Sequence, residues 1–290
     1  MTQQQAAEHE RPGTRVDGVE VLGALSPSRA ADFRSCPLRY RFRTIDRLPE
    51  PPSPAAVRGT VVHKVLERLF DLPARARTPE HADELVQGAW QEVFAAEPDV
   101  VTMFEEGPAL EEGTAFGEWL TSCHEVLRRY FDLEDPRALE PAHREEYVET
   151  LLESRLLLRG IVDRIDIAPD GAVRVVDYKT GRSPGVGFEA SALSQMRFYA
   201  LVIWRTHGVV PALLRLIYLG DGQLVSYAPD EADLLATERL LGALWKAIQL
   251  ARETGDWQPS PGRACTWCPH QALCPAWGGT PPPLPIPEAG

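Results

Sequence analysis

Three cysteines near the carboxyl end could bind a metal through their thiolates. They lie in "ACTWCPHQALCP" with the spacing Cys-x2-Cys-x5-Cys, at Cys265, Cys268 and Cys274. Soft metal sites made of thiolates normally have four ligands. Two further cysteines, Cys36 and Cys123, could supply the fourth. The run therefore predicts a metal centre that is completed from elsewhere in the chain.

The two candidates for the fourth ligand stand in different sequence surroundings. Cys123 lies in "WLTSCHEVLRRYF", where apolar residues at helical spacing indicate a small core residue. Cys36 ends a predicted helix directly before Pro37. Four thiolates suit zinc as well as a four-iron four-sulfur cluster, and His270 would also allow a zinc site of three cysteines and one histidine. On residue types alone, the two metals stay open.

A second group of chemical residues lies in a predicted β-hairpin. The run "IVDRIDIAPDGAVRVVDYK" places two strands around a Pro-Asp-Gly turn. Side chains alternate faces along a strand, so Asp163 and Asp177 each fall on an apolar face. If Ala168 pairs with Ala172, the two carboxylates lie directly opposite, with Cβ atoms about 5 Å apart.

Two like charges on a half-buried face repel each other, and a divalent cation would resolve the conflict. Hard oxygen ligands favour Mg²⁺ or Mn²⁺. Lys179 follows Asp177 by two residues on the same face, and it is one of only three lysines among thirty basic residues, which favours a chemical role over chance. The alternative is an ordinary hairpin in which Asp177 and Lys179 form a surface ion pair.

Three segments together resemble a known family. "GIVDRIDIAPDGAVRVVDYKTG" resembles the core of the PD-(D/E)xK nuclease superfamily, in particular its RecB-like branch. That branch includes the nuclease domains of RecBCD and AddAB and the CRISPR adaptation nuclease. "RGTVVHKVLERLF" resembles the helical motif of the branch, and "QMRFY" resembles its Gln-x3-Tyr motif. The segments also occur in the order expected for the branch.

The resemblance implies roles for particular residues of the hairpin and its neighbours. Mg²⁺ or Mn²⁺ would be held by His63, Asp163 and Asp177. The implied catalytic residues are Asp163, Asp177, Lys179, Gln195 and Tyr199, with Gln195 and Tyr199 one helical turn apart. The family often adds an acidic residue before the first core strand. The sequence does not choose among Glu145, Glu146 and Glu149 for that position.

The resemblance also implies a ligand set for the cysteines. Members of the branch with an iron-sulfur cluster take one cysteine from an N-terminal segment and three from a C-terminal Cys-x2-Cys-x5-Cys. This assigns a four-iron four-sulfur cluster to Cys36, Cys265, Cys268 and Cys274. Zn²⁺ is the alternative cofactor. Because the ligands are more than two hundred residues apart, the metal would close a long loop between the two ends of the chain.

The net charge of −12 excludes a generally basic nucleic-acid coat. A local basic strip is nevertheless present between residues 29 and 47. The predicted DNA-binding residues are Arg29, Arg34, Arg39, Arg41 and Arg43. With the interleaved Phe33, Tyr40 and Phe42, they could grip single-stranded DNA through phosphate contacts and stacking. The alternative is a solvated helix face together with core aromatics.

The periodicity of the chain predicts an α/β protein with a helical N-terminal part. The resemblance implies a restriction-endonuclease-like mixed sheet flanked by helices and a C-terminal iron-sulfur segment. We expect one nuclease domain over residues 25–278, after a flexible arm (1–24) and before a disordered tail (279–290). Helices are predicted near the following residues: 26–36, 55–70, 80–96, 110–132, 189–205 and 230–253. No membrane span or signal peptide is evident, which favours a cytoplasmic protein without membrane partners.

These features predict a metal-dependent DNA nuclease, an exonuclease with a preference for single-stranded DNA or free DNA ends. Its pathway would be DNA repair, recombination or CRISPR adaptation. The sequence contains no helicase motif, so unwinding would come from a partner such as a helicase or another repair or CRISPR protein. Two alternatives stay open: a non-catalytic DNA-binding or scaffold module of the same fold, and a structural zinc protein.

Overall fold

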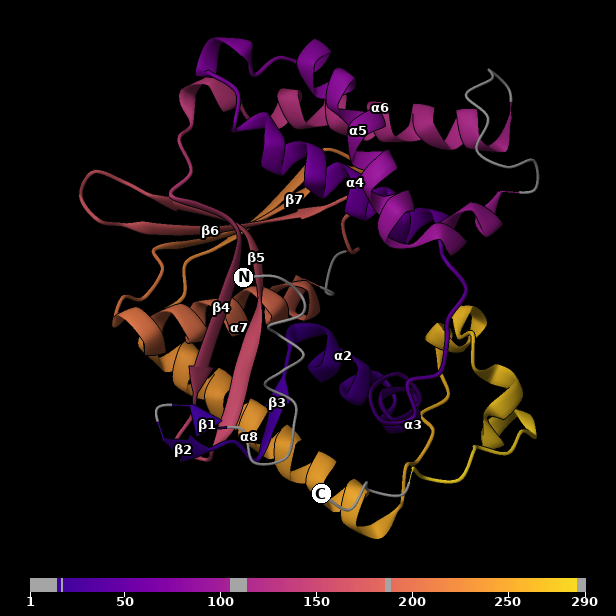
Figure 1. Ribbon diagram of the computed structural model, residues 1–290. Helices are drawn as coiled ribbons and strands as arrows, with labels where there is room; N and C mark the ends of the chain where they lie inside the picture. The colour runs from indigo at the N-terminus through magenta and orange to yellow at the C-terminus, as the bar shows by residue number, and fades with distance from the viewer. Residues whose placement is uncertain (1–14, 17, 105–113, 186–188, 286–290) are drawn as a thin grey trace. The chain divides into compact units, whose positions relative to one another are not determined.

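The computed structural model describes the chain in four stretches: residues 15–16, 18–104, 114–185 and 189–285 (Figure 1). The predicted arm and tail therefore lie partly outside the described residues. Within them, β1 (Arg15–Val16) and β2 (Val19–Glu20) pair as a short antiparallel ribbon. Residues 279–285 have no regular secondary structure, although the Pro282 carbonyl accepts a hydrogen bond from Arg41.

The chain forms two compact units, each assembled from distant segments. The first unit comprises residues 1–51, 149–160 and 231–290. The second unit comprises residues 52–148 and 161–230. This division keeps each predicted group of functional residues within one unit. The cysteine run and Cys36 belong to the first unit, and the hairpin belongs to the second.

The secondary structure agrees closely with the sequence periodicity. The α-helices are α2 (Pro27–Ser35), α3 (Pro37–Tyr40), α4 (Pro54–Leu69), α5 (Pro79–Ala96), α6 (Ala115–Leu133), α7 (Glu189–His207) and α8 (Glu231–Thr254). The remaining strands are β3 (Gly23–Leu25), β4 (His143–Leu151), β5 (Leu156–Ile167), β6 (Val173–Lys179), β7 (Leu213–Tyr218) and β8 (Gln223–Tyr227). A π-helical turn follows α3 at Arg41–Ile45. Short 3₁₀ turns occur at Ala74–Ala76, Pro98–Met103, Pro136–Ala138, Arg263–Trp267, Gln271–Leu273 and Pro275–Trp277.

The second unit has helices on both faces of a mixed sheet. Strand β6 pairs antiparallel with β5 and parallel with β7, and β7 pairs antiparallel with β8. On one face, Val176 and Tyr178 of β6 are buried with α4, α5 and α6 in a single apolar cluster. Helix α7 packs against β6 and β7, on the face opposite α4 to α6 (Figure 1). The predicted mixed sheet flanked by helices is confirmed.

The register of the predicted hairpin is confirmed. The Ala168 N–H donates to the Ala172 carbonyl (2.9 Å), and β5 and β6 pair from that point with Arg164 opposite Val176. Gly171 adopts a φ of +86°, which the turn requires and a side chain would strain. One further step along this register places Asp163 opposite Asp177.

The first unit is built around α2, α8 and β3. Ser26 caps α2 by accepting from the Arg29 N–H (3.3 Å). Strand β3 pairs in parallel with the first residues of β5. The indole of Trp245 on α8 packs directly against Gly23, leaving no room there for a side chain.

We expect Gly23→Ala to destabilise the first unit by about 1–3 kcal/mol, because a Cβ at this position would lie 2.1 Å from the Trp245 ring. The measurement is the free energy of unfolding in urea. Gly242→Ala is the matched control. Gly242 lies within α8 with nothing inside 4 Å of its virtual Cβ, so alanine there should stabilise by about 0.5–1 kcal/mol. Equal effects of the two substitutions would contradict the packing argument.

Among the described helices, none is both long enough and apolar enough to cross a lipid bilayer.

Candidate functional site

Three potential metal ligands meet in the second unit. They come from three elements: His63 from α4, Glu145 from β4 and Asp163 from β5. The Nδ1 atom of His63 lies 3.7 Å from Glu145 Oε1 and 3.6 Å from Asp163 Oδ2. Within the described residues, this is the one group of three histidine, cysteine or acidic side chains whose ligand atoms all lie within 4.8 Å of one another. The structure thus brings the predicted His63 and Asp163 together.

Tyr178, between the two charged residues of the Asp-x-Lys motif, contacts both His63 and Asp163 through its main chain. Its N–H donates to Asp163 Oδ2 (2.7 Å). Its carbonyl oxygen accepts from His63 Nε2 (2.9 Å). The apolar residues around His63 on α4, among them Val62, are buried against the sheet, which carries the imidazole to this strand end.

The structure places Glu145 beside His63, whereas the sequence did not choose among three acidic residues for the position before the first core strand. Of the three acidic candidates in β4, it is the one beside His63, whereas Glu146 lies 3.7 Å from the exposed His143 ring. Glu145 also adopts a φ of +45°, a left-handed conformation that is unfavourable for glutamate. Such strain persists where the surrounding structure imposes it, and it is frequent at functional sites. Sequence periodicity carries no signal for this local break.

The Asp-x-Lys pair forms a closed set of hydrogen bonds with α7. Asp177 is almost fully buried, and its carboxylate lies 2.7 Å from Lys179 Nζ. The Gln195 side chain joins both, since its Nε2 donates to Asp177 (2.8 Å) and its Oε1 accepts from Lys179 (2.9 Å). The same Nε2 donates to the Tyr199 hydroxyl (3.2 Å). All four predicted residues therefore lie in one contiguous group.

The electrostatics of the site favour an added cation. Burial, and then repulsion by Asp177, raise the pKa of Asp163 to about 7. For His63, burial lowers the pKa, but the neighbouring carboxylates of Glu145, Asp163 and Asp177 outweigh it and raise the pKa to about 9. The carboxylates at the site therefore carry more negative charge than the neighbouring cationic side chains balance. A divalent cation at these ligands would satisfy them.

The four cysteines assigned to one centre line one cavity in the first unit. Cys36, Cys265, Cys268 and Cys274 are all unpaired thiols that contribute to a cavity of about 40 Å³. A single water or bare ion needs only about 10–15 Å³. Two backbone N–H groups point at the sulfurs, from Ser260 to Cys36 (3.4 Å) and from Gly262 to Cys265 (3.3 Å). Such donors stabilise thiolates.

The other two candidate ligands for this centre are engaged elsewhere. His270 is buried, and its Nε2 lies 2.9 Å from Glu50 Oε1, with its ring against Phe42. Cys123 lies in the buried cluster of the second unit, as its helical spacing predicts, and burial raises the pKa of its thiol to about 12.

The predicted stacking role of the N-terminal aromatics is wrong. Phe33, Tyr40 and Phe42 are buried, and Tyr40 stacks on Trp257 at 6.0 Å between ring centroids. Aromatic residues at these spacings face the core because α2 and α3 pack their apolar sides inward. They cannot contact bases without unfolding this region.

The arginines of the strip are placed unequally. Arg41 is buried and paired with Asp46 (3.0 Å), so it serves the fold. Arg39 and Arg43 both bind Asp32, at 3.1 and 2.7 Å, while their side chains stay about one-third exposed. Arg29 and Arg34 lie on α2. DNA binding by these residues stays a prediction.

The second unit combines a mixed sheet with a group of carboxylates and a lysine on its strands and a glutamine on α7. This combination defines a restriction-endonuclease-like fold. The chain belongs to the PD-(D/E)XK nuclease superfamily, whose family model matches residues 24–275.

Individual relatives agree with this membership. The chain is 28% identical to the Gene 69 protein of Mycobacterium phage D29, over 65% of this chain and 71% of that protein. It is also 28% identical to one of the subunits of the ATP-dependent helicase/deoxyribonuclease of Streptococcus equi subsp. zooepidemicus (strain H70), over 54% of this chain but only 14% of that much longer protein. A crystal structure described as a candidate exonuclease from Eubacterium rectale shares the fold, with a TM-score of 0.55, 14% identity and coverage of 85% and 87% of the two chains.

Proposed function

We propose that this protein is a DNA exonuclease that hydrolyses phosphodiester bonds with Mg²⁺ or Mn²⁺ and favours single-stranded DNA or free DNA ends. The observation that carries the proposal is the convergence of His63, Glu145 and Asp163 beside the buried Asp177–Lys179 pair. Superfamily membership supports the reaction class.

The residues present fit a hard divalent cation. His63, Asp163 and Asp177 would hold it, as the sequence predicts, with Glu145 as an added carboxylate. The Tyr178 carbonyl accepts from His63 Nε2, which leaves His63 Nδ1, on the side of Glu145 and Asp163, as the ligand atom of the imidazole. Carboxylates with one imidazole suit Mg²⁺ or Mn²⁺. When bound, such an ion neutralises phosphate charge and lowers the pKa of a water ligand.

Lys179 has the geometry of a phosphate-binding or water-orienting group. Its side chain is 33% exposed, although Nζ is held by Asp177 and Gln195. An ammonium so directed would donate to a phosphate oxygen or to the attacking water, and would stabilise the negative charge that develops on the phosphate. Gln195 accepts from Lys179 and donates to Asp177, so it keeps both groups in a fixed relation. Tyr199 supports Gln195 through its hydroxyl.

We further propose that Cys36, Cys265, Cys268 and Cys274 bind a four-iron four-sulfur cluster. The common cavity supports four ligands at one centre. Four thiolates are the usual ligand set of such a cluster. The Glu50 contact of His270 argues against a zinc site with three cysteines and this histidine.

The pathway and partners follow from the same reasoning. We propose that this nuclease acts on DNA ends opened by a partner, in repair, recombination or CRISPR adaptation. The similarity to a short part of a helicase/deoxyribonuclease protein supports a helicase as that partner. Arg34, which is exposed on α2, and the partly exposed Arg29, Arg39 and Arg43 would contribute phosphate contacts.

The test is digestion of end-labelled single- and double-stranded DNA by protein that was stripped of divalent metal. We expect no cleavage in EDTA and progressive shortening from DNA ends after Mg²⁺ or Mn²⁺ is added, with single strands digested faster. A closed circular single strand is the control substrate, because an exonuclease leaves it intact. Cleavage that persists in EDTA, or none with either metal, would contradict the proposal.

A further inference from the structure

We propose that Tyr178 and the buried Arg164 are positioning residues that fix the metal ligands His63 and Asp163. The inference rests on the proposed function only in taking these two side chains as ligands. Neither Tyr178 nor Arg164 was singled out by the sequence, where they read as alternating residues of two strands.

The peptide groups of Tyr178 contact two ligands that come from different elements. The N–H fixes Asp163 on β5, and the carbonyl oxygen fixes His63 on α4. Partners of this kind orient metal ligands and contribute to metal affinity. A rotation of the Tyr178 backbone would therefore displace a carboxylate and an imidazole at the same time.

The side chain of Tyr178 anchors this backbone from the other face of the sheet. Its ring is buried among α4 and α6, and its hydroxyl lies 2.5 Å from Arg164 Nη1. Strand alternation sends the ring away from Asp177 while the peptide groups stay at the site. Movement of the ring is thus transmitted to the ligands through one residue.

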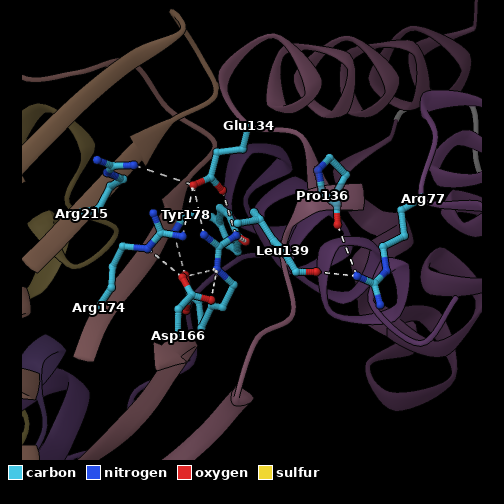
Figure 2. A network of polar contacts seen from close by, with 10 residues as sticks. Arg77, Glu134, Pro136, Leu139, Asp166, Arg174, Tyr178 and Arg215 are labelled. Atoms are coloured by element: carbon cyan, nitrogen blue, oxygen red, sulfur yellow. Dashed lines mark hydrogen bonds and ion pairs between the residues drawn. The ribbon is translucent and has the colours of Figure 1, made fainter. Parts of the chain in front are cut away.

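Arg164 is in turn held on two sides and is only 1% exposed. It makes a bidentate contact with Glu134 (2.8 and 3.1 Å), and its Nε lies 3.2 Å from Asp166. Figure 2 shows that Arg174 and Arg215 approach the same carboxylates, with Arg174 2.8 Å from Asp166. Glu134 and Asp166 thus lock the guanidinium that holds Tyr178.

Stability alone is a weak reason for such a network. Taking charged groups out of water is costly, and apolar residues of similar volume often replace a buried ion pair without loss of stability. Apolar packing would not, however, fix the direction of the Tyr178 hydroxyl. The planar fork of arginine does so, because its donors have a fixed geometry.

The test is Mn²⁺ binding to the full chain by titration calorimetry, without DNA. In Tyr178→Phe we expect the dissociation constant of the site to rise about tenfold, the low end for groups that support metal ligands. The half-activating Mn²⁺ concentration for DNA cleavage should rise by the same factor, while kcat at saturating Mn²⁺ stays within about threefold. Arg174→Gln is the matched control. Arg174 binds Asp166, as Arg164 does, but it is Arg164 that holds the Tyr178 hydroxyl.

Arg164→Met should weaken Mn²⁺ binding at least as much, although it also removes the bidentate partner of the Glu134 carboxylate and can impair folding. Tyr178→Phe keeps that ion network and so decides the question. An unchanged dissociation constant in Tyr178→Phe, or an equal rise in Arg174→Gln, would overturn the inference, as would a wild-type chain that binds no Mn²⁺. Wild-type protein that binds Mn²⁺ but cleaves no DNA would instead refute the proposed function.

Discussion

Asp177→Asn should lower the rate of DNA cleavage by about 10³-fold or more while the protein keeps its fold. Asparagine has nearly the same shape, so the Gln195 amide keeps an acceptor at the Asp177 position. The substitution removes the negative charge that pairs with Lys179 and contributes to cation binding. Losing one preorganised charged group at a reacting centre typically costs 10²–10³-fold, and loss of the metal adds to this.

The measurement is kcat on end-labelled single-stranded DNA at saturating Mg²⁺, with circular dichroism and the thermal midpoint as checks of folding. Asp170→Asn is the matched control, because Asp170 lies in the turn of the same hairpin, where its carboxylate accepts from the Ala172 N–H. We expect its activity within about twofold of wild type. Cleavage by Asp177→Asn at the wild-type rate would exclude the enzymatic interpretation and favour a DNA-binding or scaffold module.

The hairpin could be predicted because all of its determinants are local. Period-two alternation fixes the faces, and the three-residue turn fixes the register that sets Asp163 opposite Asp177. The helical spacing of Gln195 and Tyr199 likewise sets their common face. His63 could be placed near the hairpin only by resemblance, because its approach depends on how α4 packs on the sheet.

The residues that the sequence missed depend on contacts between distant segments. Arg164 directly follows Asp163, so strand alternation places its side chain on the opposite face of the hairpin, where an arginine is expected to face solvent. Its burial becomes favourable because Glu134, thirty positions earlier at the end of α6, supplies a bidentate partner. Glu145 is selected by a left-handed backbone conformation inside β4. Neither tertiary partners nor a local change of φ leave a periodic signal.

For the aromatic residues of the N-terminal strip, the sequence predicted a functional role that the structure contradicts. Interleaved arginines and aromatics suggested a surface for single-stranded DNA, but the same alternation arises when a helix buries one face. Phe33 and Tyr40 pack on Trp257, which lies more than two hundred residues later in the chain. Composition alone does not distinguish a stacking surface from an amphipathic helix whose partner is distant.

Cys36→Ala should remove the proposed cluster. Wild-type protein prepared without oxygen is expected to be brown and to contain about four iron atoms per chain. With three thiolates left in the cavity, the variant should lose most of that iron and its visible absorbance. It should also unfold more easily, by on the order of 5 kcal/mol, because the cluster closes a loop of more than two hundred residues.

Cys123→Ala separates loss of a ligand from loss of a cysteine. The Cys123 thiol is fully buried in the apolar cluster of the second unit, and this burial raises its pKa to about 12, as expected for a core residue. This variant should retain wild-type iron and absorbance and lose about 1 kcal/mol from the small cavity. Iron and zinc analysis decides between the metals: a colourless wild-type protein with one zinc would refute the cluster. Full iron retention in Cys36→Ala would refute the assignment of the fourth ligand, since the C-terminal run supplies only three.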